Sequence, residues 1–356
     1  MNKTISLDLP GALMECEIFA QPDVLGNLLA DTDRQIAAVA TAVRRRNPDM
    51  VVLVARGSSD HAALYLKYLI EVKLGLPVGL SSPSSTTLYG ANPWGPSTLV
   101  LALSQSGGSP DLVASLASAR TAGALTLALT NAPSSDLAAV AELHVDVHAG
   151  VERSVAATKS YTAELAGAYA LVRAWEGHAG ASSREVAGAV RDAALAALET
   201  RGAVTECAHD LRDVRQLVVT GRGFAYATAR ESALKFMETC YLPALAFSAA
   251  DLLHGPFALL GPDVPAVVLV PAGRASVTMA DVLERIVATG APTVSVGAGP
   301  RPVGVRLHVQ TEHDLPEDVA PIVDVIPLQL MALELARARG LDADTPRSLV
   351  KVTKTL

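Results

Sequence analysis

The sequence predicts an α/β protein of two tandem, doubly wound domains, each a parallel sheet flanked by helices. Half of its 356 residues are hydrophobic and only 4% are aromatic, a composition typical of parallel sheets whose two faces are covered by helices. Aliphatic runs end in small residues and lead into helical patterns, as in residues 50–71 and 97–123. This order of strand, turn and helix is that of βαβ units.

An internal repeat indicates that there are two domains. The run VVLVARGSSDHAALYLKYLIE around Arg56 resembles LVVTGRGFAYATARESALKFME around Arg222, 166 positions later. Further along, Gly123 and Gly290 correspond at an offset of 167. Two nearly equal offsets favour two copies of one fold over chance. The copies differ at one turn, where the second has residues 271–274 (PAGR) in place of a serine-rich turn in the first.

The repeat and the breaks between patterns give the expected boundaries. Residues 1–45 are a helical N-terminal extension, 46–185 the first domain and 200–345 the second. A short Gly/Ser break and a helix around residues 176–201 separate the domains. Residues 346–356 form a tail that we expect to dock back on the body.

Charge and cysteine content exclude several classes of protein. The formal net charge of -7 argues against a nucleic-acid surface, which needs clustered Lys and Arg. Cys16, Cys207 and Cys240 show no CxxC spacing and are typical of reduced, inert residues. No uncharged apolar run reaches the ~20 residues that span a bilayer, and the N-terminus does not resemble a signal peptide. We expect a soluble, cytoplasmic protein that contacts neither nucleic acid nor membrane.

The serine-rich turn Ser104–Ser109 is the first candidate binding site. It follows the predicted strand 99–103, and Ser109 and Pro110 suit the N-cap and the first position of a helix. Glycine amides, serine hydroxyls and a helix N-terminus together attract anions such as phosphate. The alternative is an ordinary Ser/Gly turn. No Lys-Ser/Thr pair follows the glycines and no GxGxxG follows the first strand, which argues against a triphosphatase or a dinucleotide site.

Acid–base candidates lie in the second copy. Glu231, Lys235 and Glu238 share one face of a predicted helix, either as a surface ion-pair ladder or, given their apolar neighbours, as half-buried groups. His254 precedes Gly-Pro in a loop, where it is either structural or a proton shuttle. The alternating His144-Val145-Asp146-Val147-His148 run is read as the exposed face of a strand. We therefore assign no metal and no cofactor.

Seven segments together resemble the sugar isomerase (SIS) family, specifically the isomerase half of glucosamine-6-phosphate synthase and its stand-alone relatives. The matching segments cover most of the chain in the family order: Arg56–Ser59, Ser104–Gly107, Val155–Lys159, Gly221–Gly223, Glu231–Glu238, His254–Pro256 and Pro346–Lys351. The resemblance implies two flavodoxin-like domains, each with a five-stranded parallel sheet. It also implies a homodimer with active sites near the subunit interface.

The resemblance also implies roles for individual residues. The phosphate would be bound by Ser59, Ser104, Gln105, Ser106 and Ser109. Val155 and Ala157 would line the sugar, although the family usually has Ser at the second position. Glu238 would move a proton between C1 and C2 of the sugar, with Glu231 and Lys235 beside it. His254, from the partner subunit, would open the sugar ring, and Lys351 in the tail would contact the open-chain substrate.

The expected reaction follows from a difference within the family. The synthase carries an N-terminal glutaminase domain that this sequence lacks, so we expect amination of fructose 6-phosphate not to be its main reaction. The runs ARGSSDHA, VAATKSYTAELA, LLHGP and KVTKTL resemble the SIS-type amino-sugar-phosphate deaminases. We therefore expect a glucosamine-6-phosphate deaminase. Alternatives are a galactosamine-6-phosphate deaminase or isomerase, a fructosamine-6-phosphate deglycase, or a non-catalytic sugar-phosphate sensor.

Overall fold

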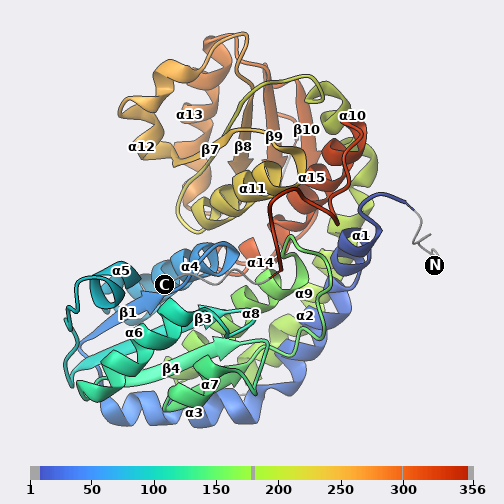
Figure 1. The fold of residues 1–356 in the computed structure, drawn as a ribbon. Coiled ribbons are helices and arrows are strands. Elements are labelled where there is room, and N and C mark those ends of the chain that lie inside the picture. The colour runs from blue at the N-terminus through green and yellow to red at the C-terminus, as the bar shows by residue number, and fades with distance from the viewer. Residues whose placement is uncertain (1–8, 178–180, 299, 352–356) are drawn as a thin grey trace. The chain divides into compact units, whose positions relative to one another are not determined.

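The computed structural model describes residues 9–177, 181–298 and 300–351, and they contain two parallel sheets (Figure 1). The strands of the first sheet are β1 (Met50–Val54), β2 (Val78–Leu80), β3 (Thr98–Ser104), β4 (Leu125–Thr130) and β5 (Leu143–Asp146). Their order is β2-β1-β3-β4-β5, and every neighbouring pair is parallel. The carboxyl ends of all five strands therefore lie along one edge.

The second sheet repeats the topology of the first. Its strands are β6 (Leu217–Gly221), β7 (Ala244–Ser248), β8 (Ala266–Val270), β9 (Thr293–Gly297) and β10 (Leu307–Gln310). Their order is β10-β9-β8-β6-β7, so β6 to β10 take the places of β1 to β5 in turn. The predicted repeat of one doubly wound α/β fold is confirmed.

Helices cover both faces of the first sheet. One group comprises α3 (Asp33–Arg46), α4 (Ser58–Leu74) and α8 (Lys159–Trp175), and the other α5 (Pro83–Thr87), α6 (Pro110–Thr121) and α7 (Asp136–Val140). The central strand β3 is buried along its whole length. Its Val100 and Ala102 pack with Leu112 and Leu116 of α6, and the residues between them point to the opposite face. Burial on both faces explains why β3 is a continuous aliphatic run.

The second sheet is covered in the same way. One group of helices comprises α10 (Arg201–Asp210), α11 (Ala225–Cys240), α14 (Pro321–Asp324) and α15 (Ile326–Ala338), and the other α12 (Ala249–Leu253), the 3₁₀ helix η1 (Pro256–Leu259) and α13 (Ala275–Ala288). Val218 and Val268 pack with Met279, Leu283 and Ile286 of α13 in one core cluster. Three of the acid–base candidates, Glu231, Lys235 and Glu238, lie on α11, which packs on β6 and β7.

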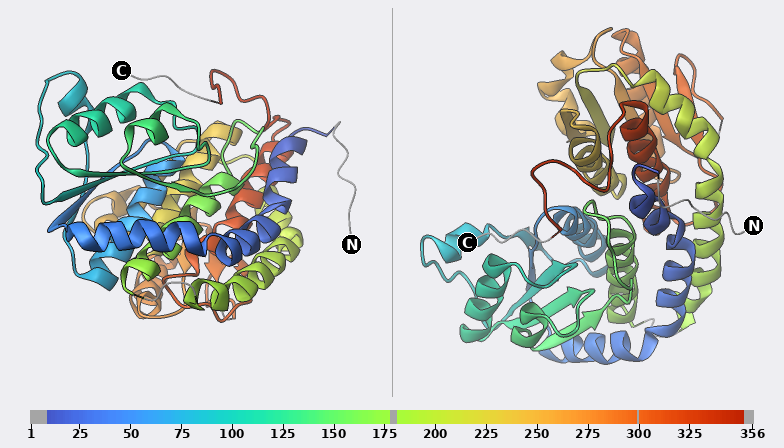
Figure 2. Two further views of the ribbon diagram at one scale, coloured as in Figure 1. Left: turned by 90° about the horizontal axis from the view of Figure 1, so that it is seen from below. Right: turned by 45° about the vertical axis from the view of Figure 1, so that its right-hand side comes forward.

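Among the described residues before β1, the chain is mainly helical. It contains α1 (Ala12–Phe19) and α2 (Gln21–Asp31) before α3, with a break at Thr32. In the chain after α8, α9 (Ala181–Glu199) and α10 are separated by Thr200 alone. Figure 2 shows the two helices in sequence, in yellow-green. Among the residues that the structure describes, no helix is long and apolar enough to cross a bilayer.

The chain passes repeatedly between two compact units. Within the described residues, the first-domain unit contains residues 23–152, 159–177, 181–189 and 350–351. The second-domain unit contains residues 9–22, 153–158, 190–298 and 300–349. Two segments that carry predicted site residues therefore belong to a different unit from the sequence that precedes them. Residues 153–158, which carry Val155 and Ala157, belong to the second-domain unit, and Lys351 of the tail belongs to the first.

Candidate active site

The serine-rich turn follows the central strand of the first sheet. Gly107 has a φ of 61°, and a Cβ there would lie 2.1 Å from Ser135 Oγ, so only glycine fits. Its amide donates to Ser104 Oγ at 3.1 Å, and the amide of Gly108 donates to Ser106 Oγ at 3.3 Å. A hydroxyl that accepts an amide proton keeps its own proton. Ser104 and Ser106 can therefore still donate to an anion.

The turn leads directly into the N-terminus of α6. Ser109 is the N-cap and Pro110 the first helical residue, as the sequence predicts. The Ser109 side chain makes no capping hydrogen bond, so the helix does not use its hydroxyl. Gln105 and Ser109 are half-buried. Four of the five predicted phosphate ligands thus lie in one turn at the positive end of a 12-residue helix.

Ser59, the fifth predicted ligand, lies in the first turn of α4. It is buried, and its Oγ donates to Glu164 Oε1 of α8 at 2.9 Å. Glu164 is itself buried, and the sequence analysis did not single it out. In this arrangement, the hydroxyl proton of Ser59 points to the Glu164 carboxylate and not to the serine-rich turn.

A guanidinium links the turn after β1 to the start of α6. Arg56 Nε donates to Asp111 Oδ2 at 2.9 Å. The Arg56 side chain is 49% exposed, whereas that of Asp111 is 1% exposed, so the pair fixes one end of a long side chain and leaves the rest accessible. The sequence analysis found Arg56 in the internal repeat and in one of the family-like segments but gave it no role. The contact places a positive charge beside the helix that follows the serine-rich turn.

The tail lysine makes an ion pair with a buried carboxylate. Lys351 Nζ lies 3.0 Å from Glu152 Oε2. Glu152 follows β5 and also accepts hydrogen bonds from Ser160 of α8, at 3.0 Å from the amide and 2.5 Å from Oγ. Lys351 of the tail thus contacts the first-domain unit, while residues 352–356 lie outside the described residues.

The acid–base candidates form a buried row on α11. Lys235 Nζ lies 3.3 Å from Glu231 Oε1 and 2.5 Å from Glu238 Oε2. The side chains of Glu231, Lys235 and Glu238 are 0%, 1% and 22% exposed, so the row is not a surface ladder and, of the three, Glu238 reaches solvent. Burial alone lowers the pKa of Lys235, but the two carboxylates outweigh that effect and raise it above its usual value. Lys235 is therefore a fixed cation.

Val155 and Ala157, the predicted sugar-lining residues, are half-buried in the second-domain unit. Their segment, residues 153–158, is attached to α15, because Gln329 Nε2 donates to the carbonyl of Thr158 at 3.3 Å. Gln329 is completely buried, so this attachment is a core contact. The segment therefore shares a compact unit with the acid–base row on α11.

His254 directly follows α12 and is exposed. Ser248 caps this short helix by accepting from the amide of Asp251 at 3.2 Å. The chain then turns at Gly255, whose φ of 128° favours glycine. The His254 ring is thus presented to solvent on a capped, glycine-terminated turn.

The second-domain counterpart of the serine-rich turn is occupied by the chain itself. This turn, residues 271–274, connects β8 to α13. There the Glu317 carboxylate accepts from the amide of Arg274 at 2.7 Å and from that of Ala275 at 3.0 Å. A Cβ at Gly273 would lie 2.5 Å from Glu317 Oε2, so the carboxylate fits closely against this turn. The chain's own anion occupies the helix N-terminus that a phosphate would need.

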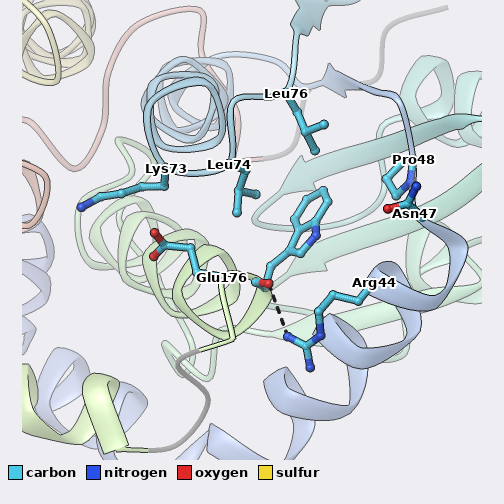
Figure 3. A pocket seen from close by; sticks show the side chains of 8 residues that line it. Arg44, Asn47, Pro48, Lys73, Leu74, Leu76 and Glu176 are labelled. Carbon is cyan, nitrogen blue, oxygen red and sulfur yellow. Dashed lines mark hydrogen bonds between the residues drawn. The ribbon is translucent and has the colours of Figure 1, made fainter.

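A pocket in the first-domain unit lies at the amino ends of the strands. It has a volume of about 560 Å³ and is lined mainly by residues just before β1 and β2 and at the ends of α3, α4 and α8: Arg44, Asn47, Pro48, Lys73, Leu74, Leu76, Trp175 and Glu176. Ligands of open α/β sheets bind at the carboxyl ends of the strands, not at these amino ends. Arg44 Nη1 also donates to the carbonyl of Trp175 at 3.4 Å, so its charge serves the end of α8 (Figure 3).

The three cysteines are free and carry no nucleophilic site. Burial raises the pKa of Cys207 to about 12 and that of Cys240 to about 11. Burial and nearby carboxylates also raise the pKa of Cys16. A thiol with a raised pKa is a poor nucleophile at neutral pH.

Curated relatives match nearly the whole chain. Glutamine–fructose-6-phosphate aminotransferase [isomerizing] from Thermococcus kodakarensis is 34% identical over 343 residues, which cover 94% of this chain and 56% of the relative. The same enzyme from a strain of Thermus thermophilus is 35% identical over 351 residues, covering 94% and 57%. The chain thus spans about half the length of the curated relatives that it matches.

Solved structures share the fold over nearly their full length. A chain from Silicibacter pomeroyi DSS-3, provisionally named a phosphosugar isomerase, is 35% identical with a TM-score of 0.81, covering 93% of this chain and 99% of that one. Glucosamine-6-phosphate deaminase from Thermotoga maritima has a TM-score of 0.76 at 18% identity, covering 96% and 100%, a likeness of fold alone. The SIS domain pattern matches residues 46–174 and 210–339. The chain belongs to the SIS domain family.

Proposed function

We propose that this protein is a glucosamine-6-phosphate deaminase that releases ammonia and fructose 6-phosphate. The observation that carries the proposal is the row on α11, in which a buried ammonium holds a partly exposed carboxylate, Glu238. Such a group suits proton transfer between neighbouring carbons of a bound sugar. The relatives support the substrate class, because the aminotransferases are named for fructose 6-phosphate.

Substrate binding relies on the first domain. The hydroxyls of Ser104, Ser106 and Ser109 and the N-terminus of α6 bind the phosphate. The net charge of -7 makes such local donors necessary, because the protein as a whole does not attract an anion. Val155 and Ala157 contact the sugar, and His254 opens its ring by transferring a proton to the ring oxygen.

The reaction itself has two stages. In the first, Glu238 removes the proton from C2 of open-chain glucosamine 6-phosphate and returns a proton to C1. The C1 carbonyl oxygen gains the proton that the C2 amine loses, so that C1 becomes a CH2OH group and C2 carries an imine. In the second, water adds to C2 of the imine, the C–N bond breaks, and ammonia leaves together with fructose 6-phosphate. Glucosamine 6-phosphate and water are thus converted to fructose 6-phosphate and ammonia without an oxidant or cofactor. Lys235 supplies a fixed positive charge beside Glu238 throughout.

The hydrolytic direction is supported by the four runs that resemble SIS-type deaminases, among them the turn at Arg56 and the tail that carries Lys351. The same resemblance supports a homodimer in which the partner's His254 completes the active site. Sedimentation equilibrium at micromolar concentration should give twice the chain mass. A monomer that remains active would contradict that arrangement.

The direct test is to incubate the protein with glucosamine 6-phosphate and measure ammonia and fructose 6-phosphate. We expect both products in equal amounts. Product from galactosamine 6-phosphate or a fructosamine 6-phosphate alone would select one of those substrates instead. Thermal stabilisation by glucosamine 6-phosphate without any product would indicate a sensor.

The role of Glu238 is tested by Glu238→Gln. Loss of the base should lower kcat by about 10²-fold or more. Binding of fructose 6-phosphate by calorimetry should change little, because the phosphate turn is intact. Glu284→Gln, an exposed position on α13, is the matched control and should retain full activity. Near-normal turnover by the Glu238→Gln variant would show that another group moves the proton.

A further inference from the structure

Glu152 is a buried carboxylate to which the proposed reaction gives no role. Its side chain is 0% exposed, although carboxylates are seldom buried without compensation. Its hydrogen-bond donors include the amide and the hydroxyl of Ser160 and the ammonium of Lys351. Ser160 lies in the first turn of α8, where the helix dipole also favours a negative charge. The site is therefore built to keep an anion in one position.

Lys351 is the cation that this anion attracts. Its side chain is 25% exposed, while the tail residues just before it, Ser348, Leu349 and Val350, are exposed. A long lysine side chain on an exposed segment has many available conformers, and fixing it costs entropy. The charge-assisted hydrogen bond to a buried, already oriented carboxylate offsets that cost. Glu152 thus determines where the ammonium of Lys351 stands in the first-domain unit.

The same helix connects this ion pair with the predicted phosphate ligands. Ser160 and Glu164 are one turn apart on α8, and Glu164 accepts the hydrogen bond of Ser59. α4, which carries Ser59, packs along α8. Ser59 lies in the first turn of α4, at the carboxyl end of β1, and Glu152 follows β5 at the same edge of the sheet. The ammonium is therefore placed at the edge where the substrate phosphate is expected.

We propose that Glu152 is the positioning residue for Lys351: it holds the tail ammonium at the carboxyl edge of the first sheet. The inference rests on the proposed function for its consequence in catalysis, but the placement of Lys351 does not. In Glu152→Gln, the amide oxygen can still accept from Ser160, while the attraction to the ammonium is lost. In Ser160→Ala, the charge of Glu152 remains while one donor is removed.

The first experiment measures the position of Lys351 without any substrate. The protein is treated briefly with an amine acylating reagent, and the modification of Lys351 is followed by mass spectrometry. In Glu152→Gln, we expect Lys351 to react about tenfold faster, the change that corresponds to losing one charge-assisted hydrogen bond. Ser160→Ala should react at nearly the wild-type rate. An unchanged rate in Glu152→Gln would overturn the proposal.

The second experiment measures the consequence for turnover. Glu152→Gln should lower kcat for glucosamine 6-phosphate and leave KM nearly unchanged, and Glu152→Asp should restore part of kcat. The double variant Glu152→Gln, Lys351→Ala should be no slower than Lys351→Ala alone, because Glu152 acts through the lysine. Additive losses would overturn the positioning role.

The two hypotheses can fail separately. If the wild-type protein forms no ammonia while the acylation result is as expected, then the proposed function fails and the placement of Lys351 stands. If Glu152→Gln does not fold, as judged by circular dichroism, then Glu152→Asp replaces it. The shorter carboxylate should still raise the acylation rate of Lys351, and an unchanged rate in that variant would also overturn the proposal.

Discussion

Lys235 differs from an ordinary helical lysine in how completely it is buried between two carboxylates. The α4 pair Lys67–Glu71 has the same i,i+4 spacing as Glu231–Lys235, but its side chains are 28% and 38% exposed rather than 1% and 0%. An exposed pair of this kind contributes little to stability, whereas a buried one leaves a costly charge behind when a partner is removed. The contribution of Lys235 to the stability of the fold therefore depends on its burial and not on its spacing from Glu231.

Lys235→Met should consequently destabilise the protein by about 3–5 kcal/mol, because Glu231 loses the ammonium that neutralises it inside the core. Lys67→Met should cost less, about 1–2 kcal/mol, because it removes a partly exposed ion pair and one hydrogen bond to the carbonyl of Val78. Urea unfolding followed by circular dichroism measures both. If the two variants lost similar stability, then the α11 row would be no more than a helical ion pair.

At the scale of the element, α13 is stabilised by a carboxylate from a distant loop. Glu317 lies 43 positions from Arg274, yet it accepts the amides of Arg274 and Ala275 at the helix N-terminus. The carboxylate thereby satisfies donors that the helix itself leaves unpaired and interacts favourably with the helix dipole. At the equivalent position in the first domain, the N-terminus of α6, the hydroxyls and amides of the serine-rich turn stand in place of a carboxylate.

Removal of this cap should weaken the second domain. We expect Glu317→Ala to lower the free energy of unfolding by about 0.5–2 kcal/mol, the usual cost of losing an N-terminal cap. Glu312→Ala, an exposed position in the same loop, should change it by less than about 0.5 kcal/mol. Chemical unfolding of the two variants compares them directly, and equal effects would contradict the capping role.

The elements also show what the sequence could and could not predict. The parallel, doubly wound sheets, the repeat and the cap at Ser109 follow from local pattern, turn chemistry and the rules of parallel sheets. The partners Glu152, Glu164 and Glu317 do not, because each is joined to its counterpart by folding rather than by sequence. The contacts Ser59–Glu164 and Glu152–Lys351 span 105 and 199 positions. Hydrophobic periodicity predicts which face of a helix or strand a residue occupies, but not which distant residue it contacts.

Considered as a whole molecule, the chain contains two copies of one sheet, but of their two equivalent turns the serine-rich one alone is open to a phosphate. We therefore expect one sugar phosphate to bind per chain, since Glu317 fills the equivalent turn of the second copy. Titration with fructose 6-phosphate in a calorimeter should give a stoichiometry near one. The Ser106→Ala, Ser109→Ala double variant should abolish this binding. Two equivalents per chain, or unchanged binding in the double variant, would contradict the assignment of the site.

The passage of the chain between the two compact units limits how the protein could have changed in evolution. Each unit borrows pieces from the sequence of the other: residues 153–158 lie within the first repeat but belong to the second-domain unit, and Lys351 follows the second repeat but pairs with Glu152 of the first. Each compact unit is thus complete only with segments from the other part of the chain. Neither repeat could be lost, exchanged with another gene or expressed alone without leaving its neighbour incomplete. Selection therefore acts on the pair as one inheritable unit.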